Sequence, residues 1–133
     1  MTKPDCLFCE LLREVSPRIV DSDELSYVIE DGFPITKGHL LVISKRHAKD
    51  YFELSEEEHL SVLDLLAKHK KRIQDEDPSV SGFNVGMNSG QSAGQTIFHC
   101  HVHLIPRRAG DVEDPRGGVR HVITEKGYYQ DSI

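Results

Sequence analysis

Histidines and apolar residues alternate over residues 99–104, within a run of strand-preferring residues at 97–105, and this alternation predicts a strand with two different faces. Successive side chains of a strand point to opposite sides, so three imidazoles would share one face and three apolar side chains the other. The apolar face predicts a half-buried strand, which Pro106 is expected to close. The histidines are His99, His101 and His103, and the apolar residues are Cys100, Val102 and Leu104.

Two other segments have the spacing of amphipathic helices. Residues 6–15 place leucines at helical intervals and are followed by Pro17, which predicts a short helix. A longer helix is expected to begin at Ser55, because Ser55 and Glu58 have the spacing of a capping box, and to stop at Asp77. Its predicted apolar stripe consists of Val62, Leu63, Leu66 and Ile73.

Short apolar or alternating stretches predict the remaining strands. They lie at residues 18–21, 25–30, 38–43, 82–87 and 119–124. The order of helix, strands, long helix and strands predicts an α+β fold around an antiparallel sheet. A chain of 133 residues fits one domain, expected over residues 1–133.

Composition and charge argue against several classes of protein. The apolar runs are shorter than the roughly 18 residues of a membrane span. The N-terminus lacks the apolar core of a signal peptide, so we expect a cytoplasmic protein without a membrane partner. The net charge of −6 argues against nucleic-acid binding. Basic residues still cluster at positions 45–47 and 107–108, which suits a small anionic ligand.

Neighbouring imidazoles on one strand face suit chemistry at an anionic centre such as phosphorus. Histidine titrates near neutrality, so one ring can act as a neutral nucleophile while its neighbour donates a charge-assisted hydrogen bond. A histidine-rich surface strand and a metal site are the alternatives to this interpretation.

Cys6 and Cys9 form a C-x-x-C motif, and Cys100 lies within the histidine strand. In a reducing compartment this motif indicates a metal site or a redox pair before a structural disulfide. One such pair is half of a zinc site, so two further ligands are required. Free thiols and a redox pair stay open as alternatives.

Residues 99–105 resemble the His-x-His-x-His-x-x signature of the histidine triad superfamily, which holds nucleotide-binding hydrolases and transferases. Residues 94–96 (Gly-Gln-Thr) and 106–108 (Pro-Arg-Arg) are similar to its dinucleoside polyphosphate hydrolase branch. The resemblance extends from residue 6 to about residue 126. It implies a five-stranded antiparallel sheet with one long and one short helix, and a homodimer.

By this resemblance, His101 attacks the α-phosphorus of a purine nucleotide and forms a nucleotidyl-histidine that water hydrolyses. His103 would donate to the phosphate from the same face, and Thr96 is the third residue expected to take part in catalysis. Asp31 is expected to hold the ribose hydroxyls. The other predicted substrate contacts are His39, Asn88, Gly94 and Gln95.

The resemblance also implies the missing metal ligands. Some bacterial members use a histidine after a Lys-Arg pair together with the first triad histidine, here His47 and His99. With Cys6 and Cys9 these residues would form a closed Cys₂His₂ site for structural zinc. The remaining histidines, expected on the surface, are His59, His69 and His121.

The leading hypothesis is an enzyme that hydrolyses a bond at the α-phosphate of purine nucleotide derivatives, with dinucleoside polyphosphates as the first candidates. A nucleoside phosphoramidase or a nucleotidyl transferase is the alternative, because the chemistry of His101 would serve either leaving group. A nucleotide-binding adaptor without catalysis is a second alternative. A zinc module alone is disfavoured, because it leaves His101, His103 and Asp31 unexplained.

Overall fold

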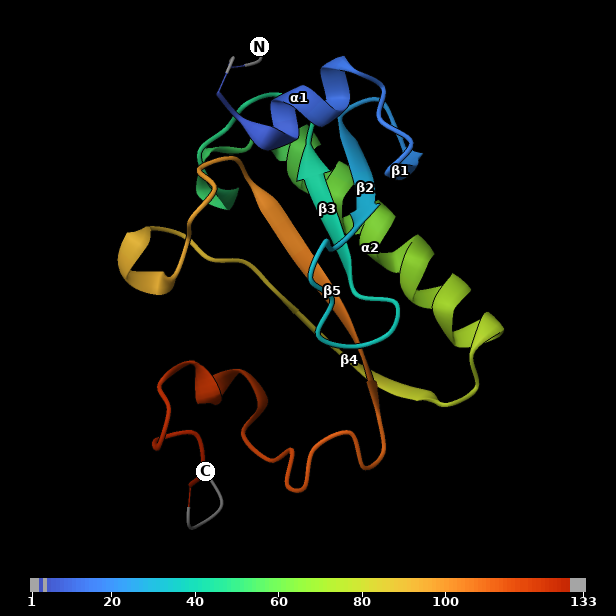
Figure 1. The fold of residues 1–133 in the computed structure, drawn as a ribbon, viewed down its shortest axis with the longest axis vertical. Helices are drawn as coiled ribbons and strands as arrows, with labels where there is room; N and C mark the ends of the chain where they lie inside the picture. Colours follow the sequence, from blue (N-terminus) through green and yellow to red (C-terminus); the bar gives the residue numbers. More distant parts are fainter. Residues whose placement is uncertain (1–2, 4, 130–133) are drawn as a thin grey trace.

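The chain folds into a five-stranded antiparallel sheet with one helix on each face (Figure 1). The computed structural model describes residue 3 and residues 5–129. The sheet order is β1-β2-β3-β5-β4, which confirms the predicted α+β class. The strands are β1 (Ile19–Ser22), β2 (Ser26–Glu30), β3 (Leu40–Ser44), β4 (Val80–Gly86) and β5 (His101–Arg108). The helices are α1 (Leu7–Arg13), α2 (Glu56–Glu76) and the 3-10 turns η1 (Tyr51–Glu53), η2 (Gln91–Ala93) and η3 (Gly118–Val122).

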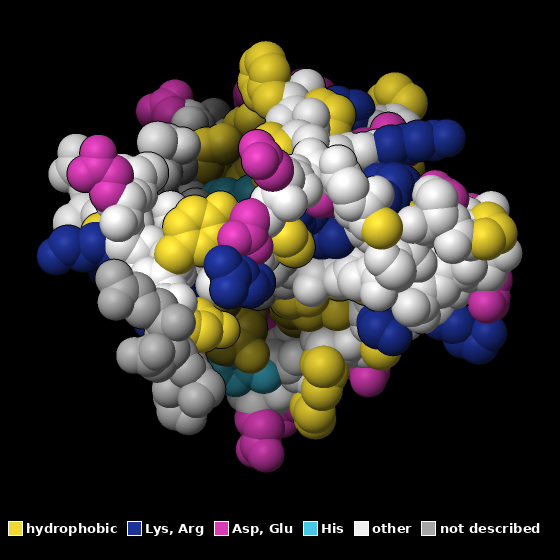
Figure 2. Space-filling model, turned by 90° about the horizontal axis from the view of Figure 1, so that it is seen from below, with side chains coloured by type: hydrophobic (Ala, Val, Ile, Leu, Met, Phe, Trp, Pro, Cys, Tyr) yellow, Lys and Arg dark blue, Asp and Glu magenta, His cyan; other side chains and the backbone are white. Residues whose placement is uncertain are grey.

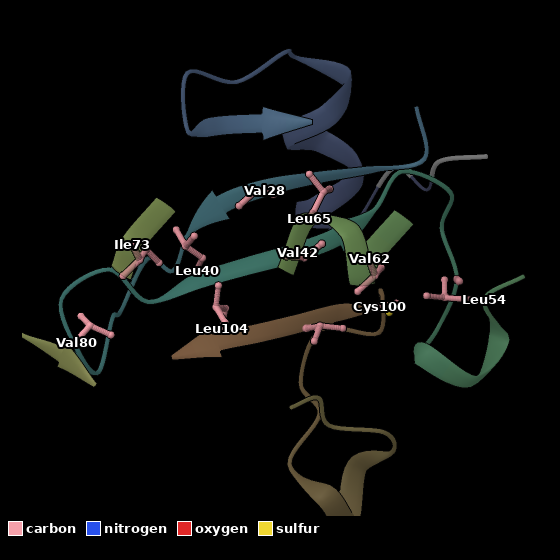
Figure 3. Packing of buried hydrophobic residues seen from close by; sticks show 12 residues of the cluster. Val28, Leu40, Val42, Leu54, Val62, Leu65, Ile73, Val80, Cys100 and Leu104 are labelled. Carbon is pink, nitrogen blue, oxygen red and sulfur yellow. The ribbon is translucent and has the colours of Figure 1, made fainter. Parts of the chain in front are cut away.

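The two faces of the sheet bury different side chains. In β3, Leu40 and Val42 pack toward α2, whereas Leu41 and Ile43 pack toward α1. Figure 3 shows the larger core, where side chains of β2, β3 and β5 meet those of α2. The α2 residues in this core are Val62, Leu65 and Ile73. Among the described residues, no helix is both long and apolar enough to cross a membrane.

Helix α2 begins where the sequence predicts. The Ser55 hydroxyl accepts a hydrogen bond from the Glu58 amide at 3.2 Å, and the Glu58 carboxylate accepts one from the Ser55 amide at 2.8 Å. Two orphan amides are thereby paired, which completes a capping box. The predicted apolar stripe is wrong at Leu63, which is 58% exposed, because Leu65 takes the core position.

The expectation that His69 lies on the surface is also wrong, because its imidazole is buried at the α2–β1 contact. Its Nε2 lies 2.8 Å from a carboxylate oxygen of Asp21, and its Nδ1 accepts from Arg72 Nε at 3.1 Å. Both ring nitrogens are therefore paired. A buried imidazole is stable when its polar atoms are satisfied, so His69 reads as a structural residue.

Strand β5 is displaced relative to the predicted strand over residues 97–105. It begins at His101 and continues through Pro106. The Cys100 amide donates to the Ala48 carbonyl at 2.7 Å, so the chain just before β5 is held by a loop. Proline is tolerated inside β5 because the pairing with β3 ends at Leu104, and only β4 lies beside residue 106.

The segment after β5, residues 109–129, folds back below the sheet (Figure 1). The strand predicted at residues 119–124 is wrong, because residues 118–122 form η3. Gly117 has a φ of 94°, which turns the chain in a way that favours glycine and opposes an extended strand. Arg120 Nε donates to the Gly127 carbonyl at 2.9 Å, so the segment closes on itself.

Candidate active site

The second and third triad histidines lie on the α1 side of the sheet. In the β3–β5 register, His101 pairs with Ile43 and His103 pairs with Leu41, and both β3 residues face α1. The two imidazole centroids are 5.6 Å apart. The structure therefore places two of the three predicted imidazoles side by side on β5, whereas His99 precedes the strand and its ring lies at Cys6 and Cys9.

The tautomer of His101 is fixed by the backbone. Its Nδ1 lies 2.7 Å from the His99 carbonyl oxygen, and a carbonyl only accepts, so the ring donates from Nδ1. Burial lowers the pKa of His101 below that of an ordinary histidine, which keeps the ring neutral at pH 7. Nε2 then carries a lone pair, as a nucleophile requires.

His103 has the opposite tautomer, because a chain of hydrogen bonds reaches it through His39. The Ile35 amide donates to His39 Nδ1 at 3.2 Å, so the proton of the His39 ring lies on Nε2. This Nε2 is 2.9 Å from His103 Nδ1 and donates to it. The His103 proton therefore lies on Nε2, where it is available to a phosphate oxygen. Burial lowers the pKa of His103 to about 4.

Asp31 lies next to this pair. One carboxylate oxygen accepts from the Phe33 amide at 2.8 Å, and the other lies 3.4 Å from His39 Nε2 and 3.9 Å from His103 Nδ1. Asp31, His39 and His103 thus bring potential metal ligands within 4.8 Å of one another. The protonated Nε2 of His39 has no lone pair to bind a cation. We therefore interpret the cluster as a hydrogen-bond network with fixed proton positions, and not as a metal site.

An open cleft of about 840 Å³ lies beside these residues. Asp31, His39, His103 and Asn88, all predicted site residues, line it. Gly86 lies opposite His103 in the β4–β5 register. A Cβ atom added at Gly86 would meet no heavy atom within 4 Å, so there is open space beside the His103 ring. The structure therefore brings these predicted residues to one cavity.

Four of the predicted catalytic and substrate-binding residues are not among those that line this cleft: His101, Gln95, Thr96 and Gly94. His101 packs against Phe8 of α1, with ring centroids 4.9 Å apart. Gln95 is buried in the loop before β5, where its Oε1 accepts from the Gly90 amide at 2.9 Å and its Nε2 donates to the Lys49 carbonyl at 2.7 Å. Its side chain therefore shapes the loop. Thr96 is exposed and lines a separate hollow beside Cys6 and His47. Gly94, with a φ of 95°, ends η2.

The four predicted metal ligands are gathered at the N-terminus of α1. Nδ1 of His99 lies 3.2 Å from Cys6 Sγ, 3.4 Å from Cys9 Sγ and 3.2 Å from His47 Nδ1. Cys9 Sγ is 3.3 Å from His47 Nδ1. Tetrahedral zinc with bonds of about 2.0–2.3 Å separates its ligand atoms by about 3.3–3.8 Å. The spacing of these atoms is close to that of a Cys₂His₂ zinc site.

The protonation of this cluster also suits a cation. His99 Nε2 lies 2.6 Å from the Ser44 carbonyl and donates to it, so the lone pair on Nδ1 faces the two sulfur atoms. Cys6, Cys9 and His99 are buried. Burial raises the pKa of the Cys6 thiol, because a thiolate without a counter-charge is poorly solvated there. A bound dication would supply that charge.

The three arginines among the basic residues noted in the sequence are paired within the protein. Arg46 donates to both carboxylate oxygens of Glu58, at 3.0 and 2.7 Å. Arg108 donates to Asp77 at 2.9 Å. Arg107 donates to both oxygens of Asp111, and these hydrogen bonds lower the pKa of the carboxyl below its usual range. These three guanidinium groups are therefore already neutralised.

Sequence reasoning missed one wall of the cleft. Val112, Val119, His121 and Val122 from the C-terminal segment line it together with Asp111. His121, expected as an ordinary surface residue, lies in this wall with Nε2 2.8 Å from the Arg116 carbonyl. Residues far apart in the sequence meet here through the fold-back after β5. The local pattern of a polar, turn-rich segment carries no signal of that contact.

Comparison with known proteins supports the resemblance seen in the sequence. A family model described as "HIT domain" matches residues 13–110. An adenosine 5'-monophosphoramidase from Schizosaccharomyces pombe is 37% identical over 103 residues, covering 77% of this chain and 74% of the relative. A HIT family protein from Bacillus anthracis has a TM-score of 0.76 and 32% sequence identity, and the match covers 99% of this chain and 84% of that protein. A zinc-bound histidine triad family protein from Mycobacterium smegmatis has a TM-score of 0.74 and 32% sequence identity, and the match covers 80% of this chain and 78% of that protein.

Proposed function

The chain belongs to the histidine triad (HIT) family, and from this premise we propose that it hydrolyses a nucleoside phosphoramidate at its α-phosphorus. The observation that carries the proposal is the pair of opposite tautomers at His101 and His103. One ring offers a lone pair on Nε2, and its neighbour offers a proton on Nε2. A nucleophile and a donor on one strand face suit substitution at a phosphoryl group.

In the proposed first step, Nε2 of His101 bonds to the α-phosphorus while the phosphorus–nitrogen bond to the leaving amine breaks. The departing nitrogen takes a proton from solvent, and the Nε2–H of His103 donates a hydrogen bond to a phosphoryl oxygen as negative charge builds there. In the second step, water attacks the same phosphorus and releases a proton to solvent while the bond to His101 breaks. Nucleoside monophosphate leaves and His101 returns to its neutral form. Asp31, at the edge of the cleft, is proposed to accept the ribose hydroxyls.

The leaving group is proposed to be an amine for two reasons. Arg107 lines the cleft, and Arg108 follows it in the chain. Their guanidinium groups are paired with Asp111 and Asp77, so they offer no free positive charge to a polyphosphate. The relative from Schizosaccharomyces pombe is named as a monophosphoramidase. A dinucleoside polyphosphate is the second candidate substrate, on the similarity of residues 94–96 and 106–108 to that branch of the family.

Zinc is the proposed ion for the cluster of Cys6, Cys9, His47 and His99, with a structural role. Bound there, it would supply a fixed tetrahedral link between α1 and the chain entering β5. His99 contributes its ring to that cluster and its carbonyl to the His101 tautomer. We therefore propose that the metal site and the nucleophile are coupled through one residue. The homodimer implied by the family stays a prediction, which light scattering would test.

A rate panel tests the proposal. Adenosine phosphoramidate, adenylyl-lysine and diadenosine tri- and tetraphosphate are compared with the parent protein and with His101→Asn. We expect turnover of the phosphoramidates and a loss of about 10⁴-fold or more in the variant, the scale set by loss of a catalytic nucleophile. His59→Asn, which changes a histidine on α2 outside the cleft, is the matched control. Full activity of His101→Asn would overturn the proposal.

A further inference from the structure

We propose that Asp111 determines substrate specificity by holding Arg107, which keeps the cleft without a free cation and selects against polyphosphate leaving groups. This inference rests on the proposed function, because it concerns what leaves the α-phosphorus. It assigns a role to two residues that the chemistry at His101 and His103 does not use.

The Arg107 guanidinium group donates hydrogen bonds from all three of its nitrogen atoms. Its Nε donates to one Asp111 oxygen and its Nη2 to the other, both at 2.8 Å. Its Nη1 donates to the Asn84 side-chain oxygen at 2.7 Å. The Arg108 amide also donates to Asp111, at 3.0 Å, which fixes the carboxylate in place. A bidentate pair held at four points does not open readily for a passing anion.

The charge balance of the cleft follows from this pair. Among the lining residues that the structure describes, Arg107 is the one lysine or arginine, whereas Asp31 and Asp111 are both acidic. Of the three lining histidines, His39 and His103 have pKa values lowered by burial and are neutral at pH 7, and His121 is paired through Nε2 with the Arg116 carbonyl. A leaving group with several negative charges would therefore enter a cavity whose uncompensated charge is negative.

The remaining lining favours an apolar substituent. Val112, Val119 and Val122 of the C-terminal segment expose 47%, 64% and 82% of their surface, and Val85 of β4 exposes 48%. Figure 2, seen from the side of that segment, shows several groups of hydrophobic side chains on this face, with charged side chains between them and histidine visible in recesses. Exposed valines around a cleft are a favourable surface for the carbon skeleton of an amine.

The decisive variant is Asp111→Asn, which keeps the size of the side chain and removes its charge. The Arg107 guanidinium would then be free to bind a phosphate, a geometry that arginine favours. We expect kcat/KM for diadenosine tetraphosphate to rise by about tenfold or more, the size of one charge-assisted hydrogen bond. The rate with adenosine phosphoramidate should change by less than about threefold, and the gain should shrink at high salt.

Asp114→Asn is the matched control, because it removes the same charge from the same segment. Asp114 pairs with Arg116 at 2.9 Å, and neither residue lines the cleft. An equal gain in this control would show a general effect of net charge and would overturn the proposal. The double variant Arg107→Gln/Asp111→Asn should lose the gain, since the freed guanidinium is its cause.

Two further measurements keep the inference separate from the proposed function. Binding of inorganic tripolyphosphate, followed by calorimetry, should tighten in Asp111→Asn whether or not the protein turns over any substrate. Val119→Lys places a cation in the cleft without changing Arg107 or Asp111, and it should also tighten tripolyphosphate binding. It serves as the test if Asp111→Asn does not fold. Unchanged tripolyphosphate affinity in both variants would refute the role of Asp111. Absent phosphoramidate turnover by the parent protein would instead refute the proposed function.

Discussion

Replacing His39 tests the order of protons that makes His103 a donor. His39 Nε2 donates to His103 Nδ1 at 2.9 Å, and this bond holds the His103 proton on the opposite nitrogen. In His39→Ala the Nδ1 of the partly buried His103 loses its partner. An unsatisfied buried acceptor costs about 1–3 kcal/mol. A free-energy change of 1.36 kcal/mol is tenfold in rate, so kcat should fall by about 5- to 150-fold.

The conservative variant separates positioning from packing. In His39→Gln the side-chain amide nitrogen can reach the place of Nε2 and still donate to His103, so most of the rate should return. Steady-state kinetics with adenosine phosphoramidate would measure both variants. The loss should appear in kcat and leave KM within about threefold, because the His103 proton acts on charge that develops in the transition state. Equal losses in the two variants, or a loss confined to KM, would refute the reasoning.

Three other predictions follow from the structure. Activity should be constant near neutral pH and fall on acidification with a midpoint below about 6.5, because burial lowers the pKa of His101. Protonation of the ring removes its nucleophilic lone pair. A midpoint above the pKa of free histidine would contradict this prediction. Ser55→Ala should reduce the free energy of unfolding by about 1 kcal/mol in urea denaturation, through loss of the α2 cap; no change would show that the cap contributes nothing. Cys9→Ala or a strong chelator should remove bound zinc and lower the thermal midpoint by about 10 °C; metal analysis that finds no zinc in the parent protein would exclude the ion.

The fold could be predicted where local signals were strong. The capping box at Ser55 and Glu58 marked the start of α2, and alternation marked the faces of β5. The errors lie where a tertiary contact decides. His69 is buried because Asp21, far away in the sequence, pairs with it. Residues 118–122 form a 3-10 turn because the chain reverses at Gly117, although their apolar character suggested a strand.

The candidate site was predictable to the same extent. Cys6, Cys9 and the triad histidines were predictable because each belongs to a recognisable short pattern, whereas His47 was predicted as a metal ligand from the family resemblance. The opposite tautomers were not predictable, since they depend on the His99 carbonyl and the Ile35 amide. The pairing of Arg107 with Asp111 also escaped prediction. Two adjacent arginines in a sequence indicate positive charge, but a neighbouring carboxylate that folds back decides whether that charge is free.

The most direct test of the account is the mass of the protein during turnover. The protein would be mixed with adenosine phosphoramidate, quenched in alkaline denaturant that preserves phosphorus–nitrogen bonds, and analysed intact and after digestion. The account predicts a transient gain of one adenylyl group, located on His101. A protein that turns over the substrate without any adduct, or that carries the adduct on His99 or His103, would contradict it.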